Sequence, residues 1–197
     1  MRAVELAAAD GVVLRGEVWG TGDDWLVLLH DAGSDLDAWR PLRGLEGSLL
    51  ALDLRGHGGS EGEWSESGAA LDAGTAVAFA RVEGARTVCV AAAGAAGAPA
   101  LRAADEVDAL VLLSPGPLGG DLSELRAPGV PKLVLVGALD RRADADAAAV
   151  AASSIGPALL VSLATARQGT DLLSEPQALE QLTAFLHEQL AWSRAEA

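Results

Sequence analysis

The chain has 197 residues, half of them apolar, and a formal net charge of −14 at pH 7. This length and composition predict a single globular domain, residues 1–197, that buries a core of its own. Nucleic acids and anionic membranes are bound through clustered Lys and Arg. Because 14 basic residues stand against 28 acidic ones, we expect neither of them as a partner.

The start of the chain and the cysteine content favour the cytoplasm. Glu5 and Asp10 stand where a signal peptide would need its apolar stretch. The longest uncharged run, residues 87–101, is shorter than the ~20 residues of a membrane span and is interrupted by Pro99. The single cysteine, Cys89, has no partner for an internal disulfide, which suits a reducing compartment. We therefore expect a cytoplasmic protein without a membrane-spanning segment.

Short apolar runs alternate with amphipathic stretches along the whole chain. The apolar runs predict strands at residues 3–7, 12–18, 25–29, 49–54, 87–91, 109–113, 132–136 and 158–163. Helices are predicted at residues 36–43, 67–81, 95–104, 142–152 and 175–192, the last opened by a capping box of Ser174 and Gln177. The inner runs are almost entirely apolar, as expected where both faces of a parallel sheet are covered. The pattern predicts an α/β protein with a mostly parallel sheet of about eight strands and helices on both faces.

Four of these strands continue into distinctive segments at their carboxyl ends, where open α/β sheets bind ligands. Residues 25–39 read WLVLLHDAGSDLDAW, and residues 49–62 read LLALDLRGHGGSEG. Residues 109–122 read ALVLLSPGPLGGDL and are followed by VPKLVLVGALD at residues 130–140. Together these segments resemble the α/β-hydrolase family, whose Asp-x-Arg-Gly-His-Gly-x-Ser signature the second one nearly repeats. The resemblance extends over essentially the whole chain.

The resemblance implies an α/β-hydrolase fold with its site at these loops. It implies a catalytic acid at Asp140 and an oxyanion hole made by the backbone N–H groups of Ala32 and Ala95. His30 and Asp31 correspond to the His-Gly element that supplies part of this hole and are expected to belong to the pocket, with Asp31 standing where the family has glycine. Many relatives insert a helical cap between strands six and seven; the short connection in this chain predicts no cap domain.

The nucleophile and the base of the family are missing. The Gly-x-Ser-x-Gly elbow should follow strand five, where residues 92–96 read AAGAA. Gly94 takes the serine position, or Ala93 in a frame shifted by one residue; we prefer Gly94, because glycine tolerates the strained backbone of the elbow. Gln168 takes the position of the catalytic imidazole in ATARQGTDLL, and glutamine cannot act as a general base. Of the triad only Asp140 is left.

The histidines of the chain do not replace the missing base. His187 falls on or near the polar side of the last predicted helix, and His30 ends a buried strand. His57 belongs to the Arg-Gly-His-Gly turn, where the family uses it structurally. A relocated dyad of Ser114 and His57 would have to close roughly 14 Å, three strand spacings, to about 3 Å. Ser60 is nearer to His57 but belongs to an ordinary turn.

No metal or cofactor is expected. The chain lacks any Cys and His spacing of a metal site, and the acidic group Asp140, Asp144 and Asp146 lacks the glycine and terminal glutamate of a calcium loop. The glycines of the RGHGG turn do not match the dinucleotide-binding spacing. A nicotinamide or flavin cofactor is therefore not predicted.

Three functional hypotheses follow. The leading one is a pseudoenzyme, an α/β-hydrolase homologue whose pocket binds a small molecule or a carboxylate through the Ala32 and Ala95 N–H groups, or contacts another protein. The alternative is an esterase-like hydrolase with a displaced nucleophile, or one needing only oxyanion stabilisation and Asp140. The third is a structural subunit with an occluded pocket and a large apolar outer patch. The candidate partners are thus a small ligand and a second copy of the chain.

Overall fold

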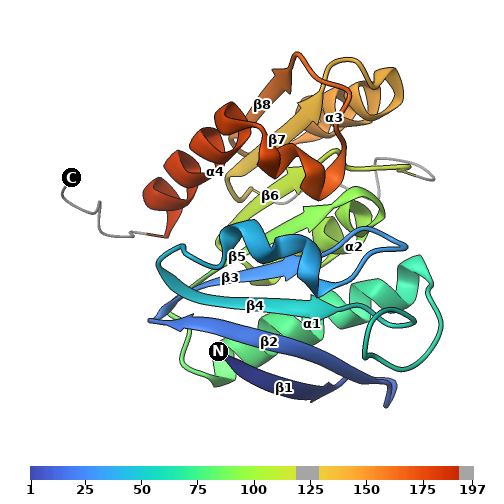
Figure 1. The fold of residues 1–197 in the computed structure, drawn as a ribbon, viewed down its shortest axis with the longest axis vertical. Helices are drawn as coiled ribbons and strands as arrows, with labels where there is room; N and C mark the ends of the chain where they lie inside the picture. Colours follow the sequence, from blue (N-terminus) through green and yellow to red (C-terminus); the bar gives the residue numbers. More distant parts are fainter. Residues whose placement is uncertain (119–128, 191–197) are drawn as a thin grey trace.

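The strands form one eight-stranded sheet in the order β1-β2-β4-β3-β5-β6-β7-β8 (Figure 1). The structure is a computed structural model, and it describes residues 1–118 and 129–190. β1 and β2 are antiparallel to their neighbours, and every pair from β3 and β4 onward is parallel. The strands are β1 (Arg2–Ala7), β2 (Val13–Thr21), β3 (Asp24–Leu29), β4 (Gly47–Asp53), β5 (Thr87–Ala93), β6 (Ala109–Leu113), β7 (Lys132–Gly137) and β8 (Ala158–Leu163). The predicted mostly parallel sheet is confirmed, with small shifts of strand ends.

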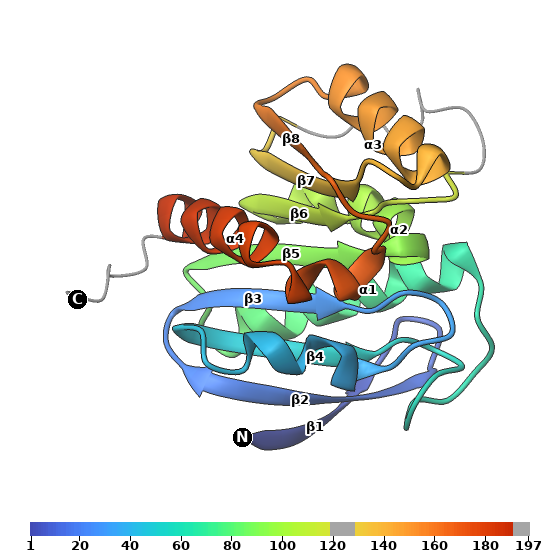
Figure 2. The same ribbon diagram turned by 45° about the horizontal axis from the view of Figure 1, so that its top comes forward.

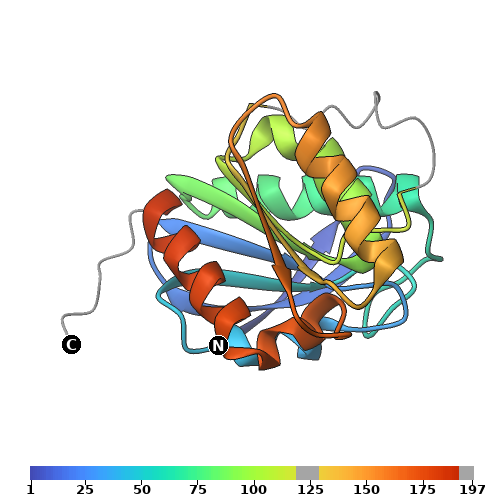
Figure 3. The ribbon, with the colours of Figure 1, turned by 90° about the horizontal axis from the view of Figure 1, so that it is seen from above.

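Helices cover both faces of this sheet, as predicted (Figure 2, Figure 3). One face packs against α1, α2 and α3, and the other against α4 and two 3-10 helices, η1 and η4. The α-helices are α1 (Glu66–Val82), α2 (Gly97–Arg102), α3 (Arg141–Ser153) and α4 (Pro176–Gln189). The 3-10 helices are η1 (Leu36–Leu42), η2 (Gly94–Ala96), η3 (Ala104–Glu106) and η4 (Gly169–Ser174). The inner strands are buried on both sides, which explains their continuous apolar sequence.

The capping box predicted for the last helix is wrong. α4 begins at Pro176, so Glu175 is its N-cap, and no side chain caps the helix there. The Ser174 hydroxyl instead donates to the carbonyl of Asp171 in η4. Proline is favoured at the first helical position because it has no N–H group to leave without a partner. With Pro176 in that position, Ser174 lies one residue before the N-cap and cannot form the box. Residues 191 and 192 of the predicted helix lie outside the described residues.

Three segments of the N-terminal half of the chain are tied together by an ion-pair network around the buried Arg55. Arg55 follows β4, is 6% exposed, and donates to both carboxylate oxygens of Asp72 on α1. The same guanidinium donates to Asp10 in the turn between β1 and β2. The hydrogen bonds of Asp72 and Asp10 raise the pKa of Arg55, and the hydrogen bond from Arg55 lowers the pKa of Asp10. Arg55 thus holds the β4 loop against α1 and the N-terminal hairpin.

The loops after β3, β5, β6, β7 and β8 all leave the sheet at its carboxyl edge. None of the described helices lies between β6 and β7, so no cap domain covers this edge within residues 1–118 and 129–190. None of them is long and apolar enough to cross a membrane. The carboxyl edge is therefore where the site must be sought.

Candidate functional site

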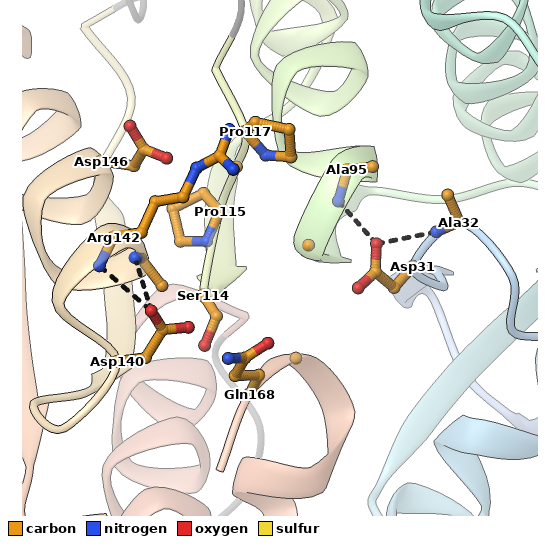
Figure 4. A pocket seen from close by; sticks show the side chains of 14 residues that line it. Asp31, Ala32, Ala95, Ser114, Pro115, Pro117, Asp140, Arg142, Asp146 and Gln168 are labelled. Carbon is orange, nitrogen blue, oxygen red and sulfur yellow. Dashed lines mark hydrogen bonds between the residues drawn. The ribbon is translucent and has the colours of Figure 1, made fainter. Parts of the chain in front are cut away.

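A cavity of about 400 Å³ lies at the carboxyl edge of the sheet. It brings together most of the residues that the sequence singled out, and Figure 4 shows them on facing walls. The predicted residues that line it are Asp31, Ala32, Gly94, Ala95, Asp140 and Gln168. This cavity differs from the occluded pocket expected of a purely structural subunit.

Gly94 stands at the turn between β5 and η2. Its φ is +52°, in the left-handed region, whereas Ala93 before it is extended, with φ −109° and ψ 141°. Glycine enters this region without the penalty that a Cβ atom would bring. The elbow backbone is therefore built at Gly94, while Ala93 ends β5 and does not line the cavity.

Asp31 occupies the predicted oxyanion hole. Its Oδ1 accepts hydrogen bonds from the backbone N–H groups of Ala32 and Ala95, both at 2.8 Å. A Cβ atom added to Gly94 would lie 2.1 Å from both the Cγ and the Oδ2 atom of Asp31. One carboxylate thus takes both N–H donors, as Figure 4 shows, and it also fills the space that a side chain at the elbow would need.

This arrangement corrects the expectation that the two N–H groups are open to a ligand oxyanion or carboxylate. Converging N–H donors in a cavity bond to any acceptor within reach, and an ionised carboxylate makes the strongest such bonds. The replacement of the family's glycine by Asp31 was visible in the sequence. That its side chain reaches Ala95, 64 residues away, was not.

Asp140 and Gln168 lie on the opposite side of the cavity from Asp31 (Figure 4). Asp140 is the N-cap of α3, and its Oδ1 accepts from the N–H groups of Arg142 and Ala143 at 3.1 and 3.2 Å. Gln168 precedes η4, and its side chain forms no cap there. The positions that match the family's acid and base therefore share the cavity, but the base position holds an amide that does not titrate.

Ser114 is a site residue that the sequence analysis considered only as part of a relocated dyad. It follows β6, lines the cavity and is a non-glycine residue with φ +46°. Its Oγ is buried, and within the described part of the chain it has no hydrogen-bond partner. Such strained conformations cost about 1–3 kcal/mol and are concentrated at functional sites. Its sequence neighbourhood, SPGP, marks a turn but does not predict the strain.

His30 and His57 serve the structure and do not face the cavity. The Nε2 of His30 accepts from the N–H of Leu54, and its Nδ1 lies 2.8 Å from the Asp31 carbonyl, so it is the donor there. The Nε2 of His57 accepts from Gly33, so its Nδ1 donates to the Arg55 carbonyl. With both nitrogens of each ring engaged, neither histidine is placed to act as a base.

The relocated dyad of Ser114 and His57 is not formed. Ser114 follows β6 and His57 follows β4, with β3 and β5 between those strands. The predicted pocket residue His30 is fully buried and lies outside the lining of the cavity. His187 lies half-buried on α4, also outside it. Among the described residues, no three His, Cys, Asp or Glu side chains are arranged to hold a metal ion.

Burial of His30 makes stability depend on pH. Burial lowers the pKa of His30 below its ordinary value of 6.5. The unfolded chain therefore binds more protons than the folded chain in acid, so the free energy of unfolding decreases as pH falls below about 6.5. We expect His30→Gln, which keeps an acceptor for the Leu54 N–H, to reduce this decrease. Urea denaturation at about pH 7.5 and about pH 5 measures it; an equal loss in both proteins would contradict the assignment.

Comparisons with known proteins agree on the fold. Residues 26–196 match the alpha/beta hydrolase family. An esterase structure from Pyrococcus furiosus is 17% identical, with a TM-score of 0.79 over 96% of this chain and 90% of that chain. A lidless serine hydrolase from Xanthomonas campestris is 21% identical, with a TM-score of 0.75 over 100% of this chain and 96% of that one.

A thermophilic esterase from Thermogutta terrifontis, solved with bound malate, is also similar. It is 16% identical, with a TM-score of 0.76 over 96% of this chain and 100% of that one. No curated protein sequence matches this chain. At these identities the structural likeness establishes the architecture and does not establish which reaction or ligand the cavity serves.

Proposed function

Since the chain belongs to the alpha/beta hydrolase family, we propose that it keeps the fold and the cavity of that family for binding a small ligand and has lost serine-hydrolase chemistry. The observation that carries this proposal is the position of Asp31. Its carboxylate accepts both N–H groups of the oxyanion hole and fills the space of the nucleophilic side chain at Gly94.

Acyl transfer in this fold needs a nucleophile, a base within hydrogen-bond reach and donors aimed at the developing oxyanion. Gly94 has no side chain, and the Gln168 amide takes up no proton. The Asp31 carboxylate puts negative charge where the reaction would generate more of it. Loss of a single oxyanion donor costs about 10²–10³ in kcat, so the loss of all three elements leaves no esterase mechanism of this type.

The cavity that remains has the features of a binding site, being concave with a few converging polar groups. The net charge of −14 supports a ligand other than a polyanion. Because the only cysteine, Cys89, is buried and its thiol is free, we place this activity in the reducing cytoplasm.

The test is direct. The purified chain is assayed with p-nitrophenyl acetate and butyrate and treated with a fluorescent fluorophosphonate, beside a heat-denatured sample and an active serine esterase of the same fold. We expect turnover no higher than in the denatured sample and no covalent labelling. Saturable turnover or labelling by the native chain would overturn the proposal.

A second candidate is a hydrolase with a displaced nucleophile, and Asp31 itself favours it. Its Oδ2 lies where a serine side chain would project from Gly94. Attack by this oxygen on an ester would form an anhydride and release the alcohol, and water would then have to open the anhydride. In that case the native chain hydrolyses esters without fluorophosphonate labelling, and Asp31→Asn abolishes the turnover. Esterase activity that survives Asp31→Asn excludes this candidate.

A further inference from the structure

The cavity carries an excess of negative charge. Among the described residues that line it, Asp31, Asp140 and Asp146 are acidic and only Arg142 is basic. In Figure 4 the Arg142 side chain extends towards Pro117, away from Asp140. None of the three carboxylates forms an ion pair with another described residue. Charge complementarity therefore favours a cationic ligand.

Ser114 adds an independent observation on the same wall. The residue is 5% exposed, and its buried Oγ has no hydrogen-bond partner among the described residues, although it lines the cavity. A buried hydroxyl left without a partner destabilises the fold, and a ligand group bonded to it would remove that penalty. Figure 4 shows this hydroxyl on the same side of the cavity as the Asp140 carboxylate and the Gln168 amide.

We propose that the cavity binds a small aliphatic amine through primary ammonium groups, with Ser114 and Asp140 on one wall and Asp31 on the other as its acceptors. This inference rests on the proposed function, because it names the class of ligand for the same cavity. Asp31 is available in this way since only its Oδ1 is held by the Ala32 and Ala95 N–H groups.

The lining distinguishes a primary ammonium from other ligands. A primary ammonium has three N–H donors, and the acceptors of the cavity are carboxylate, hydroxyl and amide oxygens. A quaternary ammonium is held by aromatic rings, and none of the described residues that line the cavity is aromatic. A ligand carboxylate finds the two N–H donors already bonded to Asp31 and three carboxylates in the lining that repel it. Carboxylates on opposite walls favour a ligand with two ammonium groups over one with a single group.

Isothermal titration calorimetry with defined probes tests the proposal. The probes are 1,4-diaminobutane, its uncharged analogue butane-1,4-diol, and tetramethylammonium chloride, at an ionic strength of about 0.15 M to screen the overall charge. We expect saturable one-to-one binding of the diamine, at least about tenfold weaker binding of tetramethylammonium, and none of the diol. Equal binding of diamine and diol, or no saturable binding of the diamine, would overturn the proposal.

Single substitutions test whether the diamine binds in this cavity. Asp31→Asn keeps an acceptor for the two N–H groups but replaces the free oxygen by a donor, so we expect the Kd of the diamine to rise about tenfold or more; Ser114→Ala should raise it several-fold. Asp144→Asn is the matched control, because it removes the same charge from α3 while Asp144 binds Ser162 and does not line the cavity.

If Asp144→Asn weakened binding as much as Asp31→Asn, the diamine would be attracted by the overall charge of the chain and the proposal would fail. Circular dichroism and urea denaturation show that each variant is folded. The result of the amine-binding experiment is independent of the result of the esterase assay that tests the proposed function. Ester turnover by the native chain overturns the latter whatever binds, and failure to bind the amine leaves the absence of turnover unaffected.

Discussion

The Gly94→Ser, Gln168→His double variant is expected to remain inactive towards p-nitrophenyl esters, and the additional change Asp31→Gly to give turnover. In the double variant the new side chain meets the Asp31 carboxylate, which lies 2.1 Å from a Cβ atom at Gly94 and keeps both oxyanion donors occupied. Removing the carboxylate frees both the space and the donors. We expect kcat/KM of the triple variant to exceed that of the double variant by at least about 10².

The control for this experiment carries alanine instead of serine at the elbow, with the other two changes retained. It has the same open oxyanion hole but no nucleophile, so it should stay at background and should not react with the fluorophosphonate. A double variant as active as the triple one would show that Asp31 moves aside without cost. The carboxylate would then not block the site.

Asp72→Ala is expected to destabilise the protein by about 3 kcal/mol or more. Asp72 is fully buried and accepts from the guanidinium and from the backbone N–H of Arg55. The substitution leaves a buried cation with only the more exposed Asp10 as partner, and a buried N–H without an acceptor. Urea denaturation at neutral pH measures the change as a lower midpoint at a similar m-value.

Glu66→Ala is the control on the same helix. Glu66 pairs with Arg102, but both side chains are 38% exposed. Exposed ion pairs contribute about 0–1 kcal/mol, so we expect a change in this range. If both substitutions had the same small effect, burial would not be what makes the Arg55 network stabilising.

The sequence predicts the sheet well because each inner strand carries its own local signal. After their first residues, Thr87 and Lys132, strands β5 and β7 contain no polar side chain, since helices cover both faces of the sheet. The start of α4 was misplaced by one residue, because serine followed three residues later by glutamine resembles a capping box, whereas Pro176 determines the first turn. Element type thus follows from pattern, and element ends depend on single competing residues.

The site residues likewise fall into those that a local motif predicts and those that depend on the folded structure. Gly94 and Gln168, which line the cavity, are predicted as site residues because each stands at a fixed place in a local motif. The role of Asp31 depends on contact between the loops after β3 and β5, which are far apart in the chain. Ser114 is recognised by its buried hydroxyl without a partner and its left-handed backbone, and neither property is encoded by a local pattern.

The contact between Asp31 and Gly94 also limits which side chains the two positions can hold at the same time. A side chain at the elbow and the Asp31 carboxylate compete for the same space, since a Cβ atom there would lie 2.1 Å from Cγ. A serine at position 94 and an aspartate at position 31 in its present rotamer therefore exclude each other. Any substitution that gives position 94 a side chain has to be combined with a change at position 31, which lies in a different loop.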